Sequence, residues 1–285
     1  MDIAGKRPET VDIHPTALVD ERARIGENVR IGPWCQIGPH VTLGAGVHLH
    51  ASVIVDGHTT LGDGVEVYPF VTIGMAPQDL KYAGEPTLCE VGAGTVIREN
   101  VTIHRGTAQG EALTRVGKNC LIMANAHVAH DCLLGDYVIV VNNVVMGGHV
   151  QIGDGARVMG SAAVHQFVRV GRGAVVGGVC GVEMDVIPYG SVLGNRARLV
   201  GLNWVGLKRS GVTSDEMQAM RKAFRTLYPR HGQGNDVLEA RIAHVRQEYG
   251  HLPRIAEMLD FMEAPSHRGL TRAARPDAQA ETEGA

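Results

Sequence analysis

The sequence predicts a parallel β-helix of hexapeptide repeats, followed by a smaller α-helical domain. An aliphatic residue recurs at every sixth position over residues 13–73, and the same spacing, displaced by one residue, returns over residues 116–182. The position four residues beyond each aliphatic residue is small or β-branched, as at Val29 and Cys120. A period of six fits neither an amphipathic helix nor an alternating strand. We therefore expect each six-residue unit to form one side of a three-sided coil.

The composition suits such a coil. Its lumen is narrow, so one medium-sized aliphatic side chain per side fills it, and aromatic residues make up only 4% of the chain. Glycine, at 37 of 285 residues, suits corners whose backbone angles a Cβ disfavours. Three units would make a coil of about 18 residues, stacked roughly 4.8 Å from the next coil. Each coil then covers its neighbours, so only the two ends need caps.

The chain divides into a coil at residues 1–195, a helical domain at 196–264 and a polar segment at 265–285 that we expect to be disordered. Two segments interrupt the coil. Residues 75–90 skip two hexads and keep the phase, so they either form a loop or replace two sides. Residues 104–115 displace the phase by one residue. Long loops on a rigid scaffold commonly carry function, which makes both segments candidates for the functional site.

The helical domain is predicted from its helix-start signals. Thr213 and Glu216 form a capping box ahead of an amphipathic helix at 214–227. Asn235 and Pro253 are expected to start two further helices. We expect the three helices to cover the open end of the coil.

Charge and cysteine usage argue against several classes of protein. The formal net charge of -3 argues against nucleic acid as the main partner, because phosphate binding favours a basic chain. The sequence contains no apolar run long enough for a membrane span and no recognisable secretion leader, so we expect a cytoplasmic protein. The five cysteines form no CxxC pair, and we interpret them as reduced, small core residues.

One edge of the coil gathers side chains suited to acid–base chemistry. His127, His130 and Asp131 lie within the second run, and His149 and Gln166 follow. His130 and Gln166 are 36 residues apart, which is two complete coils, so with His149 they should line one edge over about 10 Å. The simplest use of an exposed histidine is general-base catalysis, because its ordinary pKa is near neutral pH. The neighbouring Asp131 would orient the imidazole.

Two other interpretations of these histidines are open. They are compatible with ordinary corner residues of a coil. HxxH with a third histidine is also a zinc-binding pattern, of the kind that hexapeptide carbonic anhydrases use. Those enzymes are shorter, lack a helical domain and leave residues 75–90 without a use. We therefore expect no metal and no cofactor.

Seven segments, in the same order, match a known enzyme family. They read QDLKYAGEPT (78–87), IRENVTIHRGT (97–107), NAHVAHDC (125–132), GHV (148–150), AVHQF (163–167), VGG (176–178) and GLKR (206–209). In these segments the chain resembles the acyl-carrier-protein-dependent UDP-N-acetylglucosamine O-acyltransferases of lipid A synthesis. The resemblance implies an all-β left-handed parallel β-helix, against the usual right-handed crossover rule, with a C-terminal α-helical domain. It also implies a homotrimer with active sites between neighbouring subunits.

The resemblance implies a reaction and a set of roles. The 3-hydroxyl of UDP-N-acetylglucosamine would attack the thioester of an (R)-3-hydroxyacyl group on acyl carrier protein. His130 matches the general base, Asp131 its support, and the backbone N–H of Gly148 the group that stabilises the oxyanion. The residues that match or neighbour the substrate contacts are Asp79, Lys81, His127, His149, Gln166, Asn203 and Arg209.

Two positions bear on specificity. Gly178 stands where some relatives carry a larger residue that shortens the acyl pocket, so we expect an open groove and a longer acyl chain, with Val175 and Met184 as other candidate boundaries. Ser210 replaces the second arginine of a GLKRR segment, so phosphate or carrier contacts would differ. A basic cluster is expected to bind the acidic carrier protein: Lys208, Arg209, Arg221, Lys222 and Arg225.

The alternatives are another hexapeptide sugar acyltransferase or acetyltransferase, and a trimeric scaffold without catalysis. The N-acyltransferase of the same pathway carries a separate domain before its coil, whereas hexads here begin by residue 13. Acetyl-CoA-dependent sugar acetyltransferases lack the QDLKY loop. The sequence leaves open the preferred acyl length and the choice between UDP-N-acetylglucosamine and its 3-amino analogue.

Overall fold

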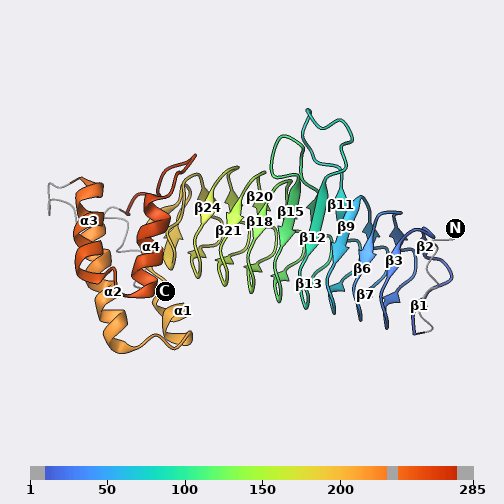
Figure 1. The fold of residues 1–285 in the computed structure, drawn as a ribbon, viewed down its shortest axis with the longest axis horizontal. Coiled ribbons are helices and arrows are strands. Elements are labelled where there is room, and N and C mark those ends of the chain that lie inside the picture. The colour runs from blue at the N-terminus through green and yellow to red at the C-terminus, as the bar shows by residue number, and fades with distance from the viewer. Residues whose placement is uncertain (1–9, 230–236, 275–285) are drawn as a thin grey trace.

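The computed structural model describes residues 10–229 and 237–274 of the chain. Very short parallel strands wind into an elongated three-sided prism, and helices pack at its C-terminal end (Figure 1). Within the described residues the strands form three sheets of 11, 9 and 8 strands. Each strand pairs in parallel with the strand one coil further on, except at the end of the 11-stranded sheet, where Gly190–Leu193 pairs antiparallel with Arg198–Leu202. The coil is a left-handed parallel β-helix, which confirms the predicted fold class.

The sheets are named A, B and C in the order in which the chain visits them. Sheet A consists of β1 (Asp12–Ile13), β4 (Arg30–Ile31), β7 (His48–Leu49), β10 (Glu66–Val67), β13 (Val96–Ile97), β16 (Leu121–Ile122), β19 (Ile139–Val140), β22 (Arg157–Val158), β25 (Val175–Val176), β27 (Gly190–Leu193) and β28 (Arg198–Leu202). Sheet B consists of β2 (Leu18–Val19), β5 (Gln36–Ile37), β8 (Ile54–Val55), β11 (Thr72–Met75), β14 (Thr102–His104), β17 (His127–Val128), β20 (Val145–Met146), β23 (Ala163–Val164) and β26 (Gly181–Val182). Sheet C consists of β3 (Arg24–Ile25), β6 (Thr42–Leu43), β9 (His58–Leu61), β12 (Leu88–Val91), β15 (Leu113–Val116), β18 (Leu133–Leu134), β21 (Gln151–Ile152) and β24 (Arg169–Val170).

The register of the sheets follows the hexads. Ile13 lies beside Ile31, Ile31 beside Leu49, and Leu49 beside Val67, so one coil takes three six-residue units. The second residue of each short strand points into the lumen, and Leu49 and Val67 are fully buried there. Val29, at the small position, is also fully buried. The two interior positions of each hexad therefore fill the lumen as expected.

The cysteines lie inside this lumen. All five are free and buried, with exposed fractions between 0% and 2%. Burial disfavours the thiolate and raises the pKa of Cys89 and Cys132 to about 12. These thiols are therefore packed as small, uncharged core groups, namely Cys35, Cys89, Cys120, Cys132 and Cys180.

The two interruptions of the coil leave it as loops on the same edge, between sheets B and C (Figure 1). The first joins β11 directly to β12, so no side of the prism is replaced, and the second joins β14 to β15. Arg105 of the second loop ties the two together. Its Nε donates to the Tyr82 hydroxyl at 2.8 Å, and its Nη1 donates to the Gly74 carbonyl at 2.9 Å.

Four helices follow the coil in the described residues. They are α1 (Trp204–Arg209), α2 (Ser214–Leu227), α3 (Leu238–Tyr249) and α4 (Pro253–Glu263). Half of the capping box forms: the Thr213 hydroxyl accepts a hydrogen bond from the Glu216 N–H at 3.2 Å, while the Glu216 carboxylate accepts from Arg254 at 3.0 Å. α2 has the bounds that the sequence predicts, whereas the short α1 was not expected. The proposed cap Asn235 lies outside the described residues. No helix in the described ranges has both the length and the apolarity that a membrane span requires.

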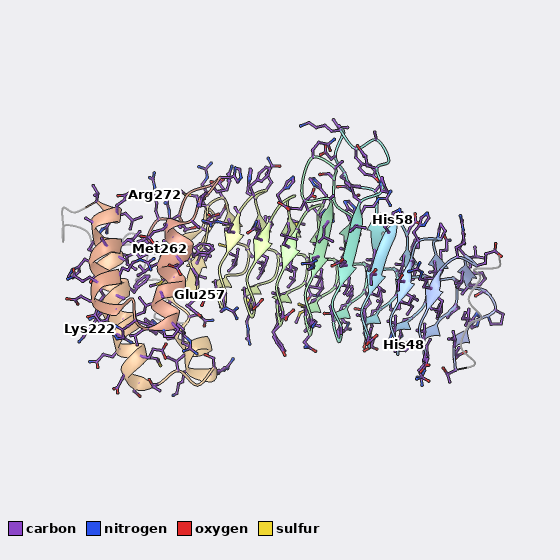
Figure 2. All side chains as sticks on the ribbon, viewed as in Figure 1. His48, His58, Lys222, Glu257, Met262 and Arg272 are labelled. Carbon is purple, nitrogen blue, oxygen red and sulfur yellow. The ribbon has the colours of Figure 1, made fainter. Side chains whose placement is uncertain are left out.

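Helix α4 covers the open end of the coil (Figures 1 and 2). Glu257 on this helix accepts hydrogen bonds from the Arg172 side chain at 2.8 Å and from the Tyr189 hydroxyl. The Arg169 guanidinium lies over the Phe261 ring at 4.4 Å. Two arginines of the coil are therefore bound to the helical domain.

The expectation of disorder from residue 265 onward does not hold for residues 265–274. Leu270 bridges to Asp185 and Ala273 to Leu199, both in parallel pairing. The Thr271 hydroxyl donates to the Met184 carbonyl at 3.0 Å. Backbone pairing with the end of the coil, which a search for apolar periodicity does not detect, orders this segment. Residues 275–285 lie outside the described residues.

Candidate active site

The predicted histidine wall forms at the edge between sheets B and C, next to the two loops. The His149 N–H donates to the His130 carbonyl at 3.0 Å, and the Phe167 N–H donates to the Gly148 carbonyl at 3.1 Å. His130, Gly148 and Gln166 therefore stack in one column of successive coils. Asp131, His149 and Phe167 form the adjacent column, and all three have positive φ, between 59° and 65°. Coil geometry thus brings together residues far apart in the sequence.

Asp131 is the best-anchored group at this edge. It is 1% exposed, and it accepts hydrogen bonds from the Thr107 N–H at 3.1 Å and the Thr107 hydroxyl at 2.6 Å. Its Oδ2 lies 2.8 Å from Nδ1 of His130. Burial opposes ionisation of this carboxyl, but the hydrogen bonds from His130 and Thr107 outweigh it and lower the pKa of Asp131. The carboxylate is therefore charged, and it holds a proton on Nδ1 of His130, which leaves the Nε2 lone pair as the basic site.

Two glycines allow this arrangement. A Cβ on Gly148 would lie 2.4 Å from Cε1 of His130, so the imidazole can rest against the backbone only where this residue is glycine. A Cβ on Gly110, in the second loop, would lie 2.5 Å from the Asp131 carboxyl carbon. Among the backbone hydrogen bonds of the described residues, the Gly148 N–H donates to no carbonyl. That donor is therefore available to a ligand beside the His130 ring.

His149 extends the wall toward the C-terminal coils. Its ring stacks on Phe167 with centroids 4.5 Å apart and meets the His130 ring edge-on at 5.1 Å. Its Nε2 lies 3.9 Å from Oδ2 of Asp131. Burial lowers the pKa of His149, and the nearby Asp131 carboxylate opposes that effect. His149 is thus a neutral hydrogen-bonding group at pH 7, held by ring contacts on two sides.

His127 and His104 form a second, more buried pair. Nδ1 of His127 lies 2.7 Å from the Thr102 hydroxyl, and its ring meets the His104 ring edge-on at 4.8 Å. Burial lowers the pKa of His127 and lowers that of His104 to about 4, with the neighbouring histidines adding to the shift. Among the described residues no partner is found for Nδ1 of His104. Both rings are therefore uncharged at neutral pH.

The sequence did not indicate His104 or Thr107 as site residues. Both lie within the IRENVTIHRGT family motif and within residues 104–115, a segment that the sequence marked as a candidate without singling out any of its residues. His104 ends β14 and is 6% exposed, while Thr107 lies in the second loop. The one available signal was the one-residue shift of the hexad phase that begins here. Such a shift indicates that the chain leaves the coil, and a loop can fold back and place its side chains at the coil edge.

The remaining predicted residues lie elsewhere in the single chain. Asp79 and Lys81 are in the first loop, where Oδ1 of Asp79 accepts from the Lys81 N–H at 3.0 Å, and the Asp79 charge acts on the pKa of His149. Asn203 caps α1, and its Nδ2 donates to the Gly173 carbonyl at 3.0 Å. Arg209 ends α1, and Gly178 lies at the corner between sheets A and B. One chain therefore does not bring these last three residues to His130.

The same edge contains a metal-like set of ligands. His130, Asp131 and His149 place ligand atoms within 4.8 Å of one another. Oδ2 of Asp131 already accepts hydrogen bonds from Thr107 and contacts His130. This carboxylate is therefore positioned by protein donors, and the absence of a catalytic metal stays a prediction.

The comparisons with known proteins agree with this geometry. A family model described as Udp N-acetylglucosamine O-acyltransferase, Domain 2, matches residues 185–271, and a bacterial transferase hexapeptide model matches 22–57 and 113–148. An acyl-[acyl-carrier-protein]–UDP-N-acetylglucosamine O-acyltransferase from Rhizobium etli is 44% identical over 267 residues, 94% of this chain and 97% of the relative.

Solved structures of such enzymes superpose along nearly the whole length. LpxA from Acinetobacter baumannii is 39% identical with a TM-score of 0.87, covering 91% of this chain and 99% of that one. A UDP-N-acetylglucosamine acyltransferase from Campylobacter jejuni is 34% identical with a TM-score of 0.85, covering 92% and 100%. Shared motifs, fold and identity together place the chain in the UDP-N-acetylglucosamine O-acyltransferase family, and the protein is an acyltransferase.

Proposed function

We propose that this acyltransferase moves an (R)-3-hydroxyacyl group from acyl carrier protein to the 3-hydroxyl of UDP-N-acetylglucosamine, the first step of lipid A biosynthesis. The observation that carries the proposal is the chain of contacts from Thr107 through Asp131 to His130, at an edge flanked by both loops. The Rhizobium relative, similar over 94% of this chain, is named for the same two substrates.

In the proposed reaction His130 is the general base. Its Nε2 accepts the proton of the sugar 3-hydroxyl while that oxygen attacks the thioester carbonyl. Asp131, kept ionised by its hydrogen bonds, stabilises the imidazolium that forms. The Gly148 N–H donates to the tetrahedral oxyanion. As the intermediate collapses, the C–S bond breaks, the ester forms, and the proton passes from His130 to the departing carrier thiolate.

The other predicted contacts supply binding and orientation. Asp79 and Lys81 would hold the sugar from the first loop, while His127, His149 and Gln166 line the cleft beside His130. Neutral His127 and His149 suit this task, because they can exchange hydrogen bonds with hydroxyl groups without competing for the base's proton.

A homotrimer would complete the site. Asn203 and Arg209 would reach the nucleotide, and Gly178 the acyl chain, from a neighbouring subunit. Support comes from the corner between sheets A and B, where Trp34, Phe70 and Val179 are 66%, 63% and 74% exposed. Bulky apolar residues at positive φ on an exposed corner are unusual in a monomer, and contact with a second copy would bury them.

The carrier would dock on the basic start of the helical domain. Lys208 and Arg209 lie in the last turn of α1. Arg221, on α2, packs its guanidinium over the Trp204 ring at 4.9 Å. We place the reaction in the cytoplasm, because five unpaired buried thiols suit a reducing compartment.

A thioester-cleavage assay tests the proposed function. The full-length protein is mixed with UDP-N-acetylglucosamine and with acyl carrier protein loaded with 3-hydroxyacyl chains of graded length, and ester formation is followed by mass spectrometry. Ester on the 3-hydroxyl is the expected product. Amide formation only with the 3-amino sugar nucleotide would reassign the acceptor, and transfer only from acetyl-CoA would overturn the assignment of the donor.

A further inference from the structure

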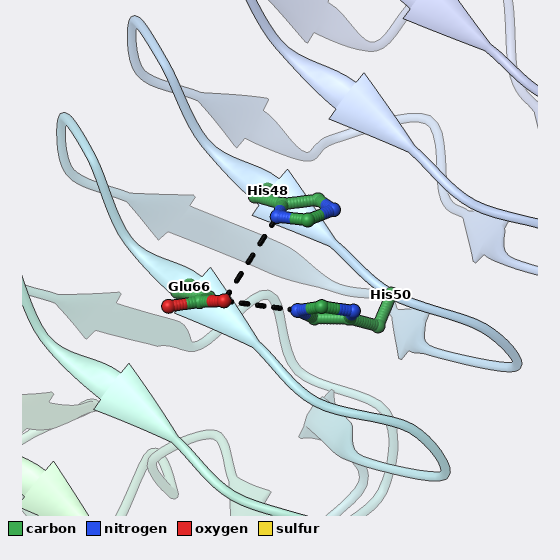
Figure 3. A group of neighbouring side chains, drawn as sticks. All are labelled: His48, His50 and Glu66. Carbon is green, nitrogen blue, oxygen red and sulfur yellow. Dashed lines mark hydrogen bonds and ion pairs between the residues drawn. The ribbon is translucent and has the colours of Figure 1, made fainter.

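Three side chains that the proposed reaction does not use lie close together (Figure 3), and His48 among them lies on the side of the coil away from the loops (Figure 2). His48 belongs to β7, and Glu66 is its direct neighbour on β10, one coil further along. His50 follows at the corner two residues after His48, and alternate residues of an extended chain project to the same face. The period of the coil therefore presents two imidazoles and a carboxylate together.

Glu66 is hydrogen-bonded to His50, and the separations of all three ligand atoms are also compatible with a shared metal ion. Oε1 of Glu66 lies 2.9 Å from Nε2 of His50 and 3.9 Å from Nδ1 of His48. All three ligand atoms lie within 4.8 Å of one another. A tetrahedral ion with bonds of about 2.1 Å holds its ligands roughly 3.4 Å apart. The two measured distances bracket that value, so small side-chain rotations would close the set around an ion.

The surroundings orient the ligands and leave access for solvent. The His50 ring stacks on Tyr68 with centroids 4.6 Å apart, and the His48 and His50 rings lie 4.1 Å apart. The three side chains are 31–37% exposed. A surface hollow adjoins them, lined by Asn28, Arg30, Gly46, His48, Gly64 and Glu66. A bound ion could therefore keep a water ligand in an open position.

The Glu66 carboxylate is the group of this set that can offset the charge of a bound cation. Among the described residues, the hydrogen-bond and ion-pair partners of the Glu66 carboxylate are the two histidines. Arg30 lies beside His48 in the ladder and opposes a cation, so carboxylate coordination is needed to offset it. Arg98, over the Tyr68 ring, is already paired with Glu99 at 3.0 Å.

We propose that His48, His50 and Glu66 bind a divalent transition-metal ion, with Zn²⁺ the best fit. Two imidazoles and one carboxylate are a ligand set that Zn²⁺ accepts with water in the fourth position. The ion would join two successive coils through their side chains. Within one chain the set uses none of the residues of the proposed reaction, since His130 lies at the edge between sheets B and C.

Zinc titration of the tag-free, chelator-stripped full-length protein tests the site. Isothermal calorimetry should give one ion per chain, and visible absorption with Co²⁺ should show tetrahedral coordination. Glu66→Gln and His50→Gln should each weaken binding at least about tenfold, since even residues that only support ligands contribute that much. His58→Gln, at a histidine of sheet C that stacks on His40, should bind as wild type.

Two further measurements separate the outcomes. Melting temperatures without metal should match among the variants, which excludes a folding defect, and zinc should raise only those of wild type and His58→Gln. Equal zinc affinity of wild type, Glu66→Gln and His50→Gln would overturn the proposal. So would one ion per three chains, or binding that is lost in His149→Gln but kept in Glu66→Gln.

Discussion

At the scale of single residues, one buried carboxylate organises the proposed catalytic edge. Asp131 accepts from Thr107 and contacts His130, while its own N–H donates to the Thr114 hydroxyl at 2.8 Å. Burial alone would raise its pKa, so the donors are what keep it ionised. Removing a donor would leave a buried charge short of partners, which costs about 1–3 kcal/mol or more. The orientation of the proposed base, His130, therefore depends on Thr107, a loop residue that binds Asp131.

Replacing the base should abolish most turnover. His130→Ala removes the proton acceptor, and we expect kcat to fall by about 100- to 10,000-fold, the usual contribution of a positioned acid–base group. Steady-state kinetics with both substrates measures it, with size-exclusion chromatography to verify the assembly. His244→Ala, at a half-exposed histidine of α3, serves as the control. A His130→Ala rate within threefold of wild type would contradict the assignment.

Part of this site could be predicted from the period of the sequence. A rigid period turns a separation in sequence into a position in space, so His130, His149 and Gln166 could be placed on one edge without a structure. Thr107 could not, because it sits in a loop that follows no period. Asn203 has both a structural and a proposed binding role, and only the structure reveals its cap on α1.

At the scale of elements, the paired strands β14 and β17 hold one buried and one half-buried histidine, and no carboxylate is among the causes of their pKa shifts. His104 ends β14, and His127 begins β17. Because the pKa of His104 is lowered to about 4, this ring takes up a proton at a lower pH in the folded protein than in the unfolded chain. Stability from this neutral ring is present above the unfolded pKa of 6.5 and is lost as pH falls toward 4. These strands should therefore make the coil acid-sensitive.

Replacing His104 with an aromatic residue that cannot be protonated should make the protein less sensitive to acid. His104→Phe keeps a flat aromatic side chain, although a larger one, and cannot be protonated. Between pH 6.5 and 4, wild type should lose up to about 3 kcal/mol of unfolding free energy relative to the variant. Urea unfolding of both proteins at several pH values measures the difference. Parallel pH curves for the two proteins would contradict the assigned shift.

The corner after β25 should set the acyl length. A Cβ at Gly178 meets only the Gly160 carbonyl oxygen, at 3.4 Å, so the chain itself tolerates a side chain there. Gly178→Met should shift preference toward shorter acyl groups by several carbons, because each excluded methylene forfeits about 0.8 kcal/mol. Competition between carriers loaded with long and short 3-hydroxyacyl groups measures the ranking. An unchanged ranking would move the boundary to Val175 or Met184.

Some elements could be predicted from the sequence and others could not. The two-residue strands follow the hexads, because in a stacked coil the interior position fixes the register. The capping box at Thr213 gave the start of α2. α1 has six residues, too few to show a helical period. The pairing of Leu270 and Ala273 joins distant parts of the chain and leaves no local pattern.

At the scale of the whole molecule, a rigid coil carries a separate basic domain at one end. The proposed base lies within the coil, while Lys208 and the start of α2 follow its last strand, β28. Two regions at fixed separation suit a donor that is itself a folded protein, since docking and chemistry can occur at different points on the enzyme.

Charge reversal at this domain should weaken carrier binding alone. The double variant Arg221→Glu/Lys222→Glu should raise the KM for acyl carrier protein, and the effect should shrink with added salt because exposed charges are screened. The KM for the sugar nucleotide should stay unchanged. Lys222→Glu alone separates docking from the packing of Arg221 on Trp204, and Arg24→Glu at the far end of the coil is the control. An unchanged carrier KM at low salt would contradict carrier docking here.

The buried cysteines along the lumen can report where the coil opens. Alkylating reagents attack the thiolate, which burial suppresses along the whole lumen, with the pKa of Cys180 raised to about 11. Each cysteine can react only when the coils around it part, so its labelling rate reports the free energy of local opening. Because Cys35 and Cys180 lie near opposite ends of the coil, mass spectrometry after brief alkylation would reveal from which end this protein begins to unwind.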